Sequence, residues 1–504
     1  MIEGFVQGLV NFTQPSVLIF LFIGTVIATL LGAFPILGGM TGCALILPFI
    51  FGMEPVVALP FLCAIMGVTY TGGVIPTILL GIPGTGPNVA TLIDGFPMAQ
   101  KGEAGRAIGA GLTASMMGGI IAVPFALIMI PLLVPLVLRF RAPEMFLTIV
   151  LGLSFLAVLT RGSMIKGFIS GGIGLLISFI GFQGMSGAAR FTFGNVYLYD
   201  GISIIDVALA LFAVPLLLDL MATGKAIASG GEASVGFSRR FREILAGARD
   251  VFRYWGLWLR SSVIGYIVGV IPGIGSETAT FAAYGQAKQT SKNPDKFGTG
   301  CVEGVIAPES ANNAKQAGAL LTTLAFGIPG SAIMAIMLAA FLMMGIQPGP
   351  RMLVDHADLC FTLLFSVVIS NIWAGIICFF GAPFLIKVTR ISPVYLFCII
   401  LPLVYIGAFV WHETLIDIII VLILSAVGVC ARKFGYSPAA MLLAFVLGSL
   451  AEYYFFHALH RYGALFFLSP ISIVLIFFIV AVLSQNAIGR LIRCWIRPRI
   501  TRAS

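Results

Sequence analysis

The sequence predicts an all-α, polytopic membrane protein with about 10–14 transmembrane segments, counting broken or re-entrant helices, in two inverted repeats. Three observations support this fold class. Of 504 residues, 59% are hydrophobic and only 10% are charged, whereas a soluble domain carries about 25% charged residues. Apolar runs long enough to cross a bilayer recur along the chain, and one Gly/Pro motif occurs in both halves.

The membrane-spanning segments are predicted from continuous apolar runs, because a helix needs roughly 20 mainly apolar residues to cross the hydrocarbon. Shorter apolar pieces, broken by Gly and Pro, lie between these runs. A β-barrel would instead show short alternating segments. The long runs lie at 17–34, 107–138, 145–160, 167–182, 204–220, 359–385, 394–410, 415–430, 438–454 and 471–483.

The net charge of +9 comes largely from short basic loops and a basic tail. This is the positive-inside pattern, and it predicts cytoplasmic placement and contact with anionic lipid rather than nucleic acid. The eight cysteines form no CxxC pair, so neither a disulfide framework nor a metal site is indicated. We expect an N-terminal repeat at 1–221, a cytoplasmic linker at 222–253, a C-terminal repeat at 254–486 and a basic cytoplasmic tail at 487–504.

The internal repeat is a Gly-Ile-Pro-Gly tetrapeptide, found at 81–84 and again at 327–330. A Gly-x-x-Pro-x-x-Gly box precedes it in each half, at 32–38 and at 269–275. Gly and Pro together break a helix, and in hydrocarbon such breaks persist only when buried or lining a cavity. The loops that follow the two motifs are predicted on opposite sides of the membrane, which indicates an inverted repeat around a central site. The alternative is that Gly and Pro are simply common in membrane helices.

Small residues, hydroxyls and amides gather around the predicted breaks, and these are the candidate substrate- or ion-binding residues. A helix that begins after a break aims free N–H groups at the gap, which suits a carboxylate without a buried Lys or Arg. Hydroxyl and amide oxygens suit a transported sodium ion, and no other metal is expected. The candidates are Pro83, Gly84, Thr85, Asn88, Thr91, Gly273, Gly275, Ser276, Thr278, Glu309, Asn312, Asn313, Gly330 and Ser331.

Glu309 is the strongest candidate for coupling or gating, because acids within membrane segments are costly and often functional. Asp94 and Glu277 also lie in or beside apolar segments. We expect residues 308–310 to form a turn beside the paired amides at 312–313. Helix capping by Ser276 and Thr278, and bracing of neighbouring helices by the amides, are alternative roles.

Several of these stretches resemble the large membrane subunit of the tripartite tricarboxylate transporters. The resemblance rests on 72–84, 90–102, 272–275, on Ala-Pro-Glu-Ser-Ala-Asn-Asn-Ala at 307–314, on 327–331 and on 345–350, and it covers nearly the whole chain. One departure is Ile36, where the family often has Gly. The resemblance implies a multi-pass bacterial inner-membrane protein that works with a small membrane subunit of about four helices and a periplasmic substrate-binding protein.

The resemblance further implies uptake of tricarboxylates or dicarboxylates driven by a sodium or proton gradient, with no cofactor. A passive pore and an intramembrane enzyme are the alternatives. An enzyme would need a nucleophile–base pair or a metal triad, but the four histidines are predicted near membrane edges, away from the Gly/Pro motifs. The sequence contains neither HExxH nor a GxxxxGK[ST] phosphate loop.

Overall fold

The structure is a computed structural model that describes residues 2–34, 38–159, 164–223, 237–271, 275–349, 351–388 and 393–484. The linker residues 224–236, the box residues 35–37 and 272–274, and the tail from 485 lie outside the described residues. The chain divides into two compact units, residues 1–137 with 203–433 and residues 138–202 with 434–504.

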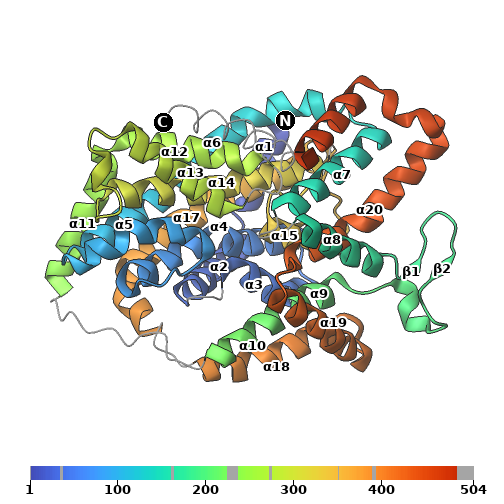
Figure 1. Cartoon of the computed structure of the whole chain (residues 1–504), viewed down its shortest axis with the longest axis horizontal. Coiled ribbons are helices and arrows are strands. Elements are labelled where there is room, and N and C mark those ends of the chain that lie inside the picture. Colours follow the sequence, from blue (N-terminus) through green and yellow to red (C-terminus); the bar gives the residue numbers. More distant parts are fainter. Residues whose placement is uncertain are drawn as a thin grey trace, which may run out of the picture. The chain divides into compact units, whose positions relative to one another are not determined.

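The first unit is entirely helical within its described residues (Figure 1). Its short 3-10 or π elements are η1 (Leu47–Ile50), η2 (Gly86–Asn88), η4 (Leu209–Ala213) and η5 (Pro294–Lys296). Its helices are α1 (Ile2–Phe12), α2 (Pro15–Ala33), α3 (Gly38–Ile46), α4 (Pro55–Leu80), α5 (Val89–Gln100), α6 (Ala104–Val137), α9 (Ile204–Ala208), α10 (Val214–Thr223), α11 (Phe237–Arg253), α12 (Trp255–Val270), α13 (Ser276–Thr290), α14 (Glu303–Phe326), α15 (Ala332–Met343), α16 (Met352–Asp355), α17 (Ala357–Val388), α18 (Pro393–His412) and α19 (Leu415–Lys433).

Within its described residues, the second unit is built on four helices and a short antiparallel strand pair. The guanidinium of Arg190, on the second strand, donates two hydrogen bonds of 2.7 and 2.8 Å to the Glu452 carboxylate, and this ion pair fixes the hairpin to a helix. The elements are α7 (Ala142–Leu159), α8 (Met164–Ser178), β1 (Gly181–Phe182), β2 (Ala189–Arg190), η3 (Val196–Asp200), α20 (Pro438–Tyr462), η6 (Gly463–Leu468) and a last helix at Pro470–Ser484.

Six helices are long and apolar enough to cross a membrane, and they are α2, α4, α6, α17, α19 and α20. Six shorter apolar helices accompany them in the described residues. The all-α, polytopic membrane fold predicted from composition is therefore confirmed, while the number of transmembrane segments stays a prediction.

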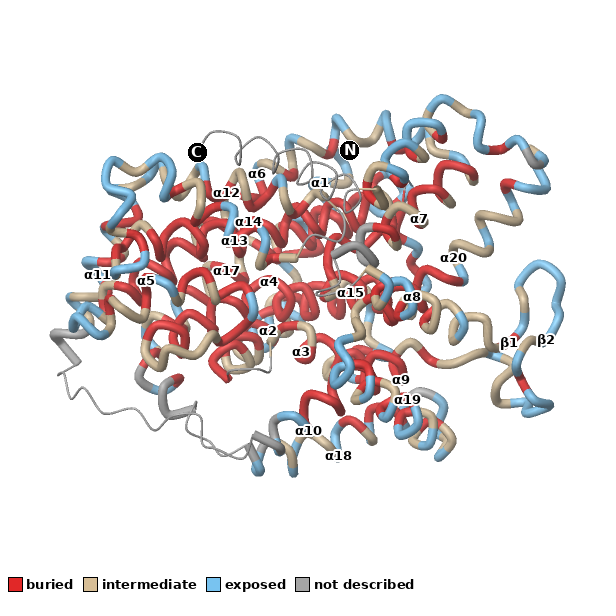
Figure 2. The backbone as a smooth tube through the Cα atoms, viewed as in Figure 1, coloured by how far each residue is buried: buried red, intermediate tan, exposed pale blue. Residues whose placement is uncertain are grey.

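Helices α4 and α14 form the core of the first unit. Figure 2 shows both as almost wholly buried, with every residue of α14 from Gly304 to Ala325 shielded from solvent. The sequence pattern predicted only short broken pieces around α4, because Pro60 and Pro76 lie inside it. The helix nevertheless continues for 26 residues, since surrounding helices cover it on all sides.

The packing of α2 on α4 recurs where α12 packs on α14. A β-carbon built on Gly32 of α2 would lie 1.9 Å from the carbonyl oxygen of Thr69 on α4. A β-carbon on Gly269 of α12 would lie 2.2 Å from the carbonyl oxygen of Lys315 on α14. In both pairs, the two helix backbones therefore touch at the glycine that opens the Gly-x-x-Pro box.

Each pair has a second contact with the roles reversed, because the glycine now lies on α4 or α14 and the carbonyl oxygen on α2 or α12. A β-carbon on Gly72 of α4 would lie 2.3 Å from the Thr29 carbonyl oxygen, and one on Gly318 of α14 would lie 2.4 Å from the Tyr266 carbonyl oxygen. On α4 and α14, Thr69 and Lys315 lie the same number of residues before their Gly-Ile-Pro-Gly motifs, and so do Gly72 and Gly318. The internal repeat is thus a repeat of packing as well as of sequence, while the inverted orientation of its two copies stays a prediction.

Candidate functional site

Both Gly-Ile-Pro-Gly motifs end a helix. Helix α4 ends at Leu80 and is followed by Gly81 with φ 67° and ψ 21°, and α14 ends at Phe326 and is followed by Gly327 with φ 66° and ψ 20°. This left-handed conformation is a common helix terminator that favours glycine. The next helices, α5 and α15, begin at Val89 and Ala332, so the chain is broken at both motifs as predicted.

A threonine one helical turn before each break accepts a hydrogen bond from the non-helical segment that follows the break. The backbone N–H of Gly84 donates to Thr77 Oγ1 at 2.9 Å, and the N–H of Gly330 donates to Thr323 Oγ1 at 3.4 Å. Each threonine hydroxyl in turn donates to a carbonyl one turn back in its own helix, at 2.6 and 2.7 Å. We call these two segments, 81–88 and 327–331, the first and second corner.

A stripe of polar side chains runs along one face of α14. Glu309, Asn312, Asn313 and Gln316 have the i, i+3, i+4, i+7 spacing of a single helix face, and all four are fully buried. The turn predicted at 308–310 is wrong, because α14 runs from Glu303 to Phe326 without interruption and contains Pro308 near its start. We call these four residues the polar stripe.

Residues of the first corner and of α5 and α6 surround the Glu309 carboxylate. Asn88 Nδ2 donates to Oε1 at 2.9 Å, Thr91 Oγ1 donates to Oε1 at 2.5 Å, and Ser115 Oγ donates to Oε2 at 2.7 Å. No basic side chain in the described ranges forms an ion pair with Glu309. This buried carboxylate is therefore satisfied by neutral donors alone, which leaves its charge uncompensated.

The two amides of the stripe differ in their hydrogen bonding. Asn313 Nδ2 donates to Thr71 Oγ1 at 2.8 Å and to Asn371 Oδ1 at 2.7 Å, but its own Oδ1 accepts no bond. Neither amide atom of Asn312 makes a hydrogen bond of normal geometry with a described residue, but the amide group lies near enough to the Glu309 carboxylate to interact with it. Two unpaired amide oxygens thus lie on the same face as an uncompensated carboxylate, a donor set that suits a hard cation.

The remaining stripe residue reaches the box of the second half. Gln316 Nε2 donates to Ser276 Oγ at 3.2 Å, while Gln316 Oε1 is unpaired. Helix α13 begins at Ser276 with Gly275 as its cap, and no side-chain capping bond forms there, so the capping alternative for Ser276 is not supported. Thr278 is exposed and does not join the buried cluster, and the predicted contact Gly273 lies outside the described residues.

The first corner and the second-half box meet at Glu277. A β-carbon on Gly86 would lie 2.5 Å from Glu277 Oε1, and one on Gly275 would lie 2.6 Å from Glu277 Oε2. Thr85 donates to Asn88 Oδ1 at 2.5 Å within the first corner, and Pro83 is half-buried there. The two halves of the chain therefore share one polar region, with Glu277 between their motifs.

The second corner also lies against α14. A β-carbon on Gly330 would be 2.8 Å from the Ala319 β-carbon and 3.2 Å from the Gly269 carbonyl oxygen. The next residue, Ser331, is buried, and its hydroxyl has no partner within the described part of the chain. Gly330 thus adjoins α14 about one turn past Gln316, the last residue of the polar stripe, and Ser331 follows it in the chain.

Sequence reasoning missed one buried charged group in this region. Lys315 is fully buried in α14, and its Nζ makes no hydrogen bond with any described residue. A buried lysine is tolerated here because α14 passes through protein rather than lipid, and whether Lys315 takes part in binding stays outside the sequence prediction. A lysine set among small residues, with no loop nearby, was the available signal.

Asp94 of α5, one of the acids noted in the sequence, holds the loop before α14. Its Oδ1 accepts hydrogen bonds from the backbone N–H groups of Gly298 at 2.9 Å, Gly300 at 2.8 Å and Cys301 at 3.0 Å. Its Oδ2 accepts a bond from the Tyr284 hydroxyl at 2.8 Å. Asp94 is therefore a structural pin that positions the start of the stripe helix.

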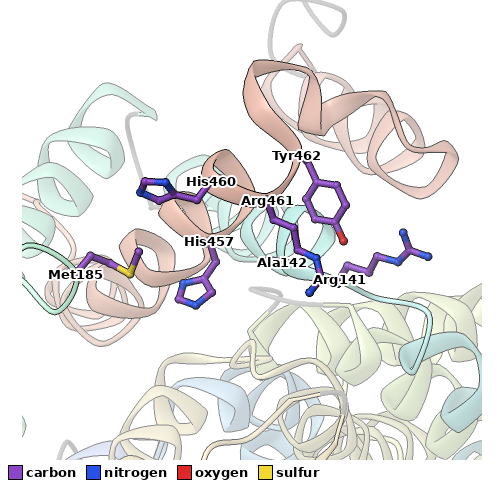
Figure 3. Close-up of a pocket in the computed structure, with 7 residues that line it drawn as sticks. All are labelled: Arg141, Ala142, Met185, His457, His460, Arg461 and Tyr462. Carbon is purple, nitrogen blue, oxygen red and sulfur yellow. The ribbon is translucent and has the colours of Figure 1, made fainter.

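A separate cavity of about 730 Å³ lies within the second unit. It contains none of the predicted site residues, and two arginines and two histidines dominate its wall (Figure 3). The lining residues are Arg141, Ala142, Met185, His457, His460, Arg461 and Tyr462.

Membrane-length helices that enclose buried, partly unpaired polar groups beside two helix breaks define a multi-pass membrane transporter. The sequence profile of the "Tripartite tricarboxylate transporter TctA family" matches residues 18–443. The chain therefore belongs to this family, as the sequence motifs predicted.

Two curated relatives come from Agrobacterium vitis. The chain is 32% identical over 452 residues to an "Uncharacterized 52.8 kDa protein in TAR-I ttuC' 3'region", which covers 90% of this chain and 89% of that protein. It is 35% identical over 188 residues to an "Uncharacterized protein in TAR-II ttuC' 3'region", which covers 37% of this chain and 78% of that protein. No solved structure matches the chain significantly.

Proposed function

We propose that this chain is the large translocating subunit of a binding-protein-dependent secondary transporter that takes up tricarboxylates or dicarboxylates. A sodium or proton gradient drives the uptake. The single observation that carries this proposal is the polar stripe of α14, because it holds buried polar atoms without partners. Leaving such atoms unpaired costs free energy, and a translocated solute that pairs with them when bound accounts for their retention.

The charges around the stripe favour co-transport of a cation. Glu309 and Glu277 contribute two carboxylates and Lys315 one ammonium group, so a substrate with two or three negative charges would enter a region without surplus positive charge. Burying uncompensated charge is strongly unfavourable. Glu309 with the Asn312 and Asn313 amide oxygens would hold the sodium ion or proton that offsets it, in line with the donor set described above.

The repeated corners support alternating access. Each corner lies between the end of one helix and the start of the next, and helix breaks of this kind bind ions and anionic groups at the centre of secondary transporters. The repeats at 1–221 and 254–486 would expose the shared site to one side of the membrane and then the other. Thr85 and Asn88 would line this site from the first corner, Thr91 from α5, and Ser276 and Ser331 from the second half.

Family membership suggests the working assembly. A periplasmic substrate-binding protein would deliver the carboxylate, and a small membrane subunit of about four helices would join this chain in the bacterial inner membrane. The basic tail at 487–504 would lie in the cytoplasm. No cofactor and no chemical step are part of this proposal.

The test is reconstitution of the chain with both partners in liposomes, followed by uptake of labelled mono-, di- and tricarboxylates. Sodium and pH gradients are imposed separately, and liposomes that contain only the partners are the control. Accumulation of a di- or tricarboxylate above equilibrium under one of these gradients is the expected result. Flux that ignores both gradients would indicate a passive pore, and chemical conversion of the solute would indicate an enzyme; either result contradicts the proposal.

A further inference from the structure

The starting point is the burial of Lys315. Its side chain has no exposed surface and is among the largest of the fully buried side chains in the described residues. Its Nζ makes no hydrogen bond with a described residue. Lysine is almost never fully buried unless it is paired. A well-packed apolar side chain of similar volume would be less costly at a position that only fills space.

The surroundings of Lys315 contain further unpaired polar groups. Asn312 lies one turn earlier on α14, and its amide makes no hydrogen bond of normal geometry with a described residue, although it lies beside the Glu309 carboxylate. The adjacent Gln316 has an unpaired Oε1, and Gly330 of the second corner packs one turn later, against Ala319. An ammonium group and an amide with unused hydrogen-bonding capacity thus lie one helical turn apart in the same buried region.

Glu277 does not satisfy the lysine. Its carboxylate attracts the ammonium group electrostatically, but no hydrogen bond joins them in the described structure. The Glu277 oxygens instead lie against Gly86 and Gly275. The three N–H donors of the Lys315 ammonium group therefore remain available to a ligand that enters between the corners.

The internal repeat shows that this charge is present in one half only. In the second copy of the repeat Gly269 packs against Lys315, and at the equivalent contact of the first copy Gly32 packs against Thr69. The Thr69 hydroxyl is already used, because it donates to the Ile65 carbonyl oxygen at 2.5 Å. Among the described residues of the polar stripe, of the two corners and of this pair of repeat positions, Lys315 is thus the only basic side chain, and it would orient an asymmetric anion in one way.

We propose that Lys315 binds one carboxylate group of the substrate directly, with the Asn312 amide as a second donor to the same group. This inference rests on the proposed transport function and adds the residue that recognises the substrate's negative charge. The remaining carboxylates of the substrate meet neutral donors and the co-transported cation. An analogue in which the recognised carboxylate is replaced by a carboxamide loses the ionic contact and is discriminated against.

The experiment compares uptake by the reconstituted complex carrying wild-type chain, Lys315→Gln or Lys315→Arg. Lys288→Gln, at an exposed lysine of α13, is the matched control. We expect Lys315→Gln to raise KM for the carboxylate by about 10- to 100-fold, the range for one lost hydrogen bond to a charged group. Wild-type protein should disfavour the carboxamide analogue strongly, and Lys315→Gln should have lost most of this preference.

Three outcomes would contradict either the proposed transport function or the binding of a carboxylate by Lys315, and each shows which of the two has failed. If wild-type protein transports no carboxylate, the proposed function itself fails. If wild-type protein transports carboxylates and Lys315→Gln keeps both KM and the preference over the carboxamide, the Lys315 inference is overturned. If Lys315→Gln with Glu277→Gln recovers wild-type KM, the lysine only balances Glu277, and the inference is again overturned.

The arginine variant keeps the test decisive if Lys315→Gln does not fold. Arginine retains the positive charge but moves it, so KM should rise less than tenfold while the preference over the carboxamide persists. Loss of that preference in a folded Lys315→Arg variant that still transports would contradict direct recognition. Folding of each variant is checked by thermal unfolding before uptake is measured.

Discussion

Replacing Asn312 by alanine should separate stability from transport. Both polar atoms of its amide are buried without a hydrogen bond of normal geometry to a described residue, and the amide has only a looser contact with Glu309, so the folded protein carries most of their desolvation cost. Removing an unsatisfied buried group recovers about 1–3 kcal/mol. Asn312→Ala should therefore leave the free energy of unfolding unchanged or raised, even though it abolishes uptake.

Asn313 is the matched control, because it is the same residue type in the same helix with the same burial. Its amide nitrogen donates to Thr71 at 2.8 Å and to Asn371 at 2.7 Å. Asn313→Ala removes both bonds and leaves buried partners unpaired, at a cost of about 1–3 kcal/mol for each. Both variants make the same change in helix propensity, so that contribution cancels in the comparison. The free energy of unfolding of Asn312→Ala should therefore be higher than that of Asn313→Ala by at least about 2 kcal/mol.

The assay is thermal unfolding of both purified variants in detergent, without substrate and then with saturating carboxylate. Substrate at 100 times its Kd stabilises a single-site binder by about 2.7 kcal/mol, and this gain should be present in wild-type protein and lost in Asn312→Ala. Equal destabilisation by the two variants would refute the reasoning, because it would mean that Asn312 has protein partners. Normal uptake by Asn312→Ala would remove it from the site.

Three further predictions concern the carboxylate, the first corner and the pin. Glu309→Gln should abolish the dependence of uptake on the sodium or proton gradient, since an amide cannot offset a cation's charge; unchanged gradient dependence in liposomes would contradict this. Gly84→Ala should prevent folding, because its β-carbon would lie 2.4 Å from the Gly73 Cα, whereas Gly285→Ala on α13 faces open space and should be tolerated; yields of folded membrane protein decide it. Asp94→Asn should lower the unfolding free energy by about 1.5–3 kcal/mol, since its hydrogen bonds lose their charge; an unchanged unfolding midpoint would show that the pin is dispensable.

Local chemistry explains what could be predicted from the sequence. The helix breaks at Gly81 and Gly327 follow from glycine's access to positive φ and from proline's missing N–H. Their recurrence in the two halves pointed to the shared polar region that Asn88, Thr91 and Glu309 now form through hydrogen bonds. These features depend on a few neighbouring residues, so they are legible in one sequence.

Tertiary packing explains what could not be predicted. Helix α4 carries Pro60 and Pro76, and it remains continuous because neighbouring helices surround it. Helix α14 is too polar to be recognised as a spanning helix, yet protein rather than lipid covers it. The roles of Lys315 and Asp94 depend on groups from distant parts of the chain, such as the backbone N–H groups that Asp94 binds.

An experimental density map of the chain bound to a tricarboxylate, in the presence of sodium, would test the shared site most directly. We predict substrate density between the first corner and the second corner, in contact with Asn312 and Lys315 on the buried face of α14. Substrate density confined to the basic cavity lined by Arg141 and Arg461, with the α14 stripe unoccupied, would contradict the account.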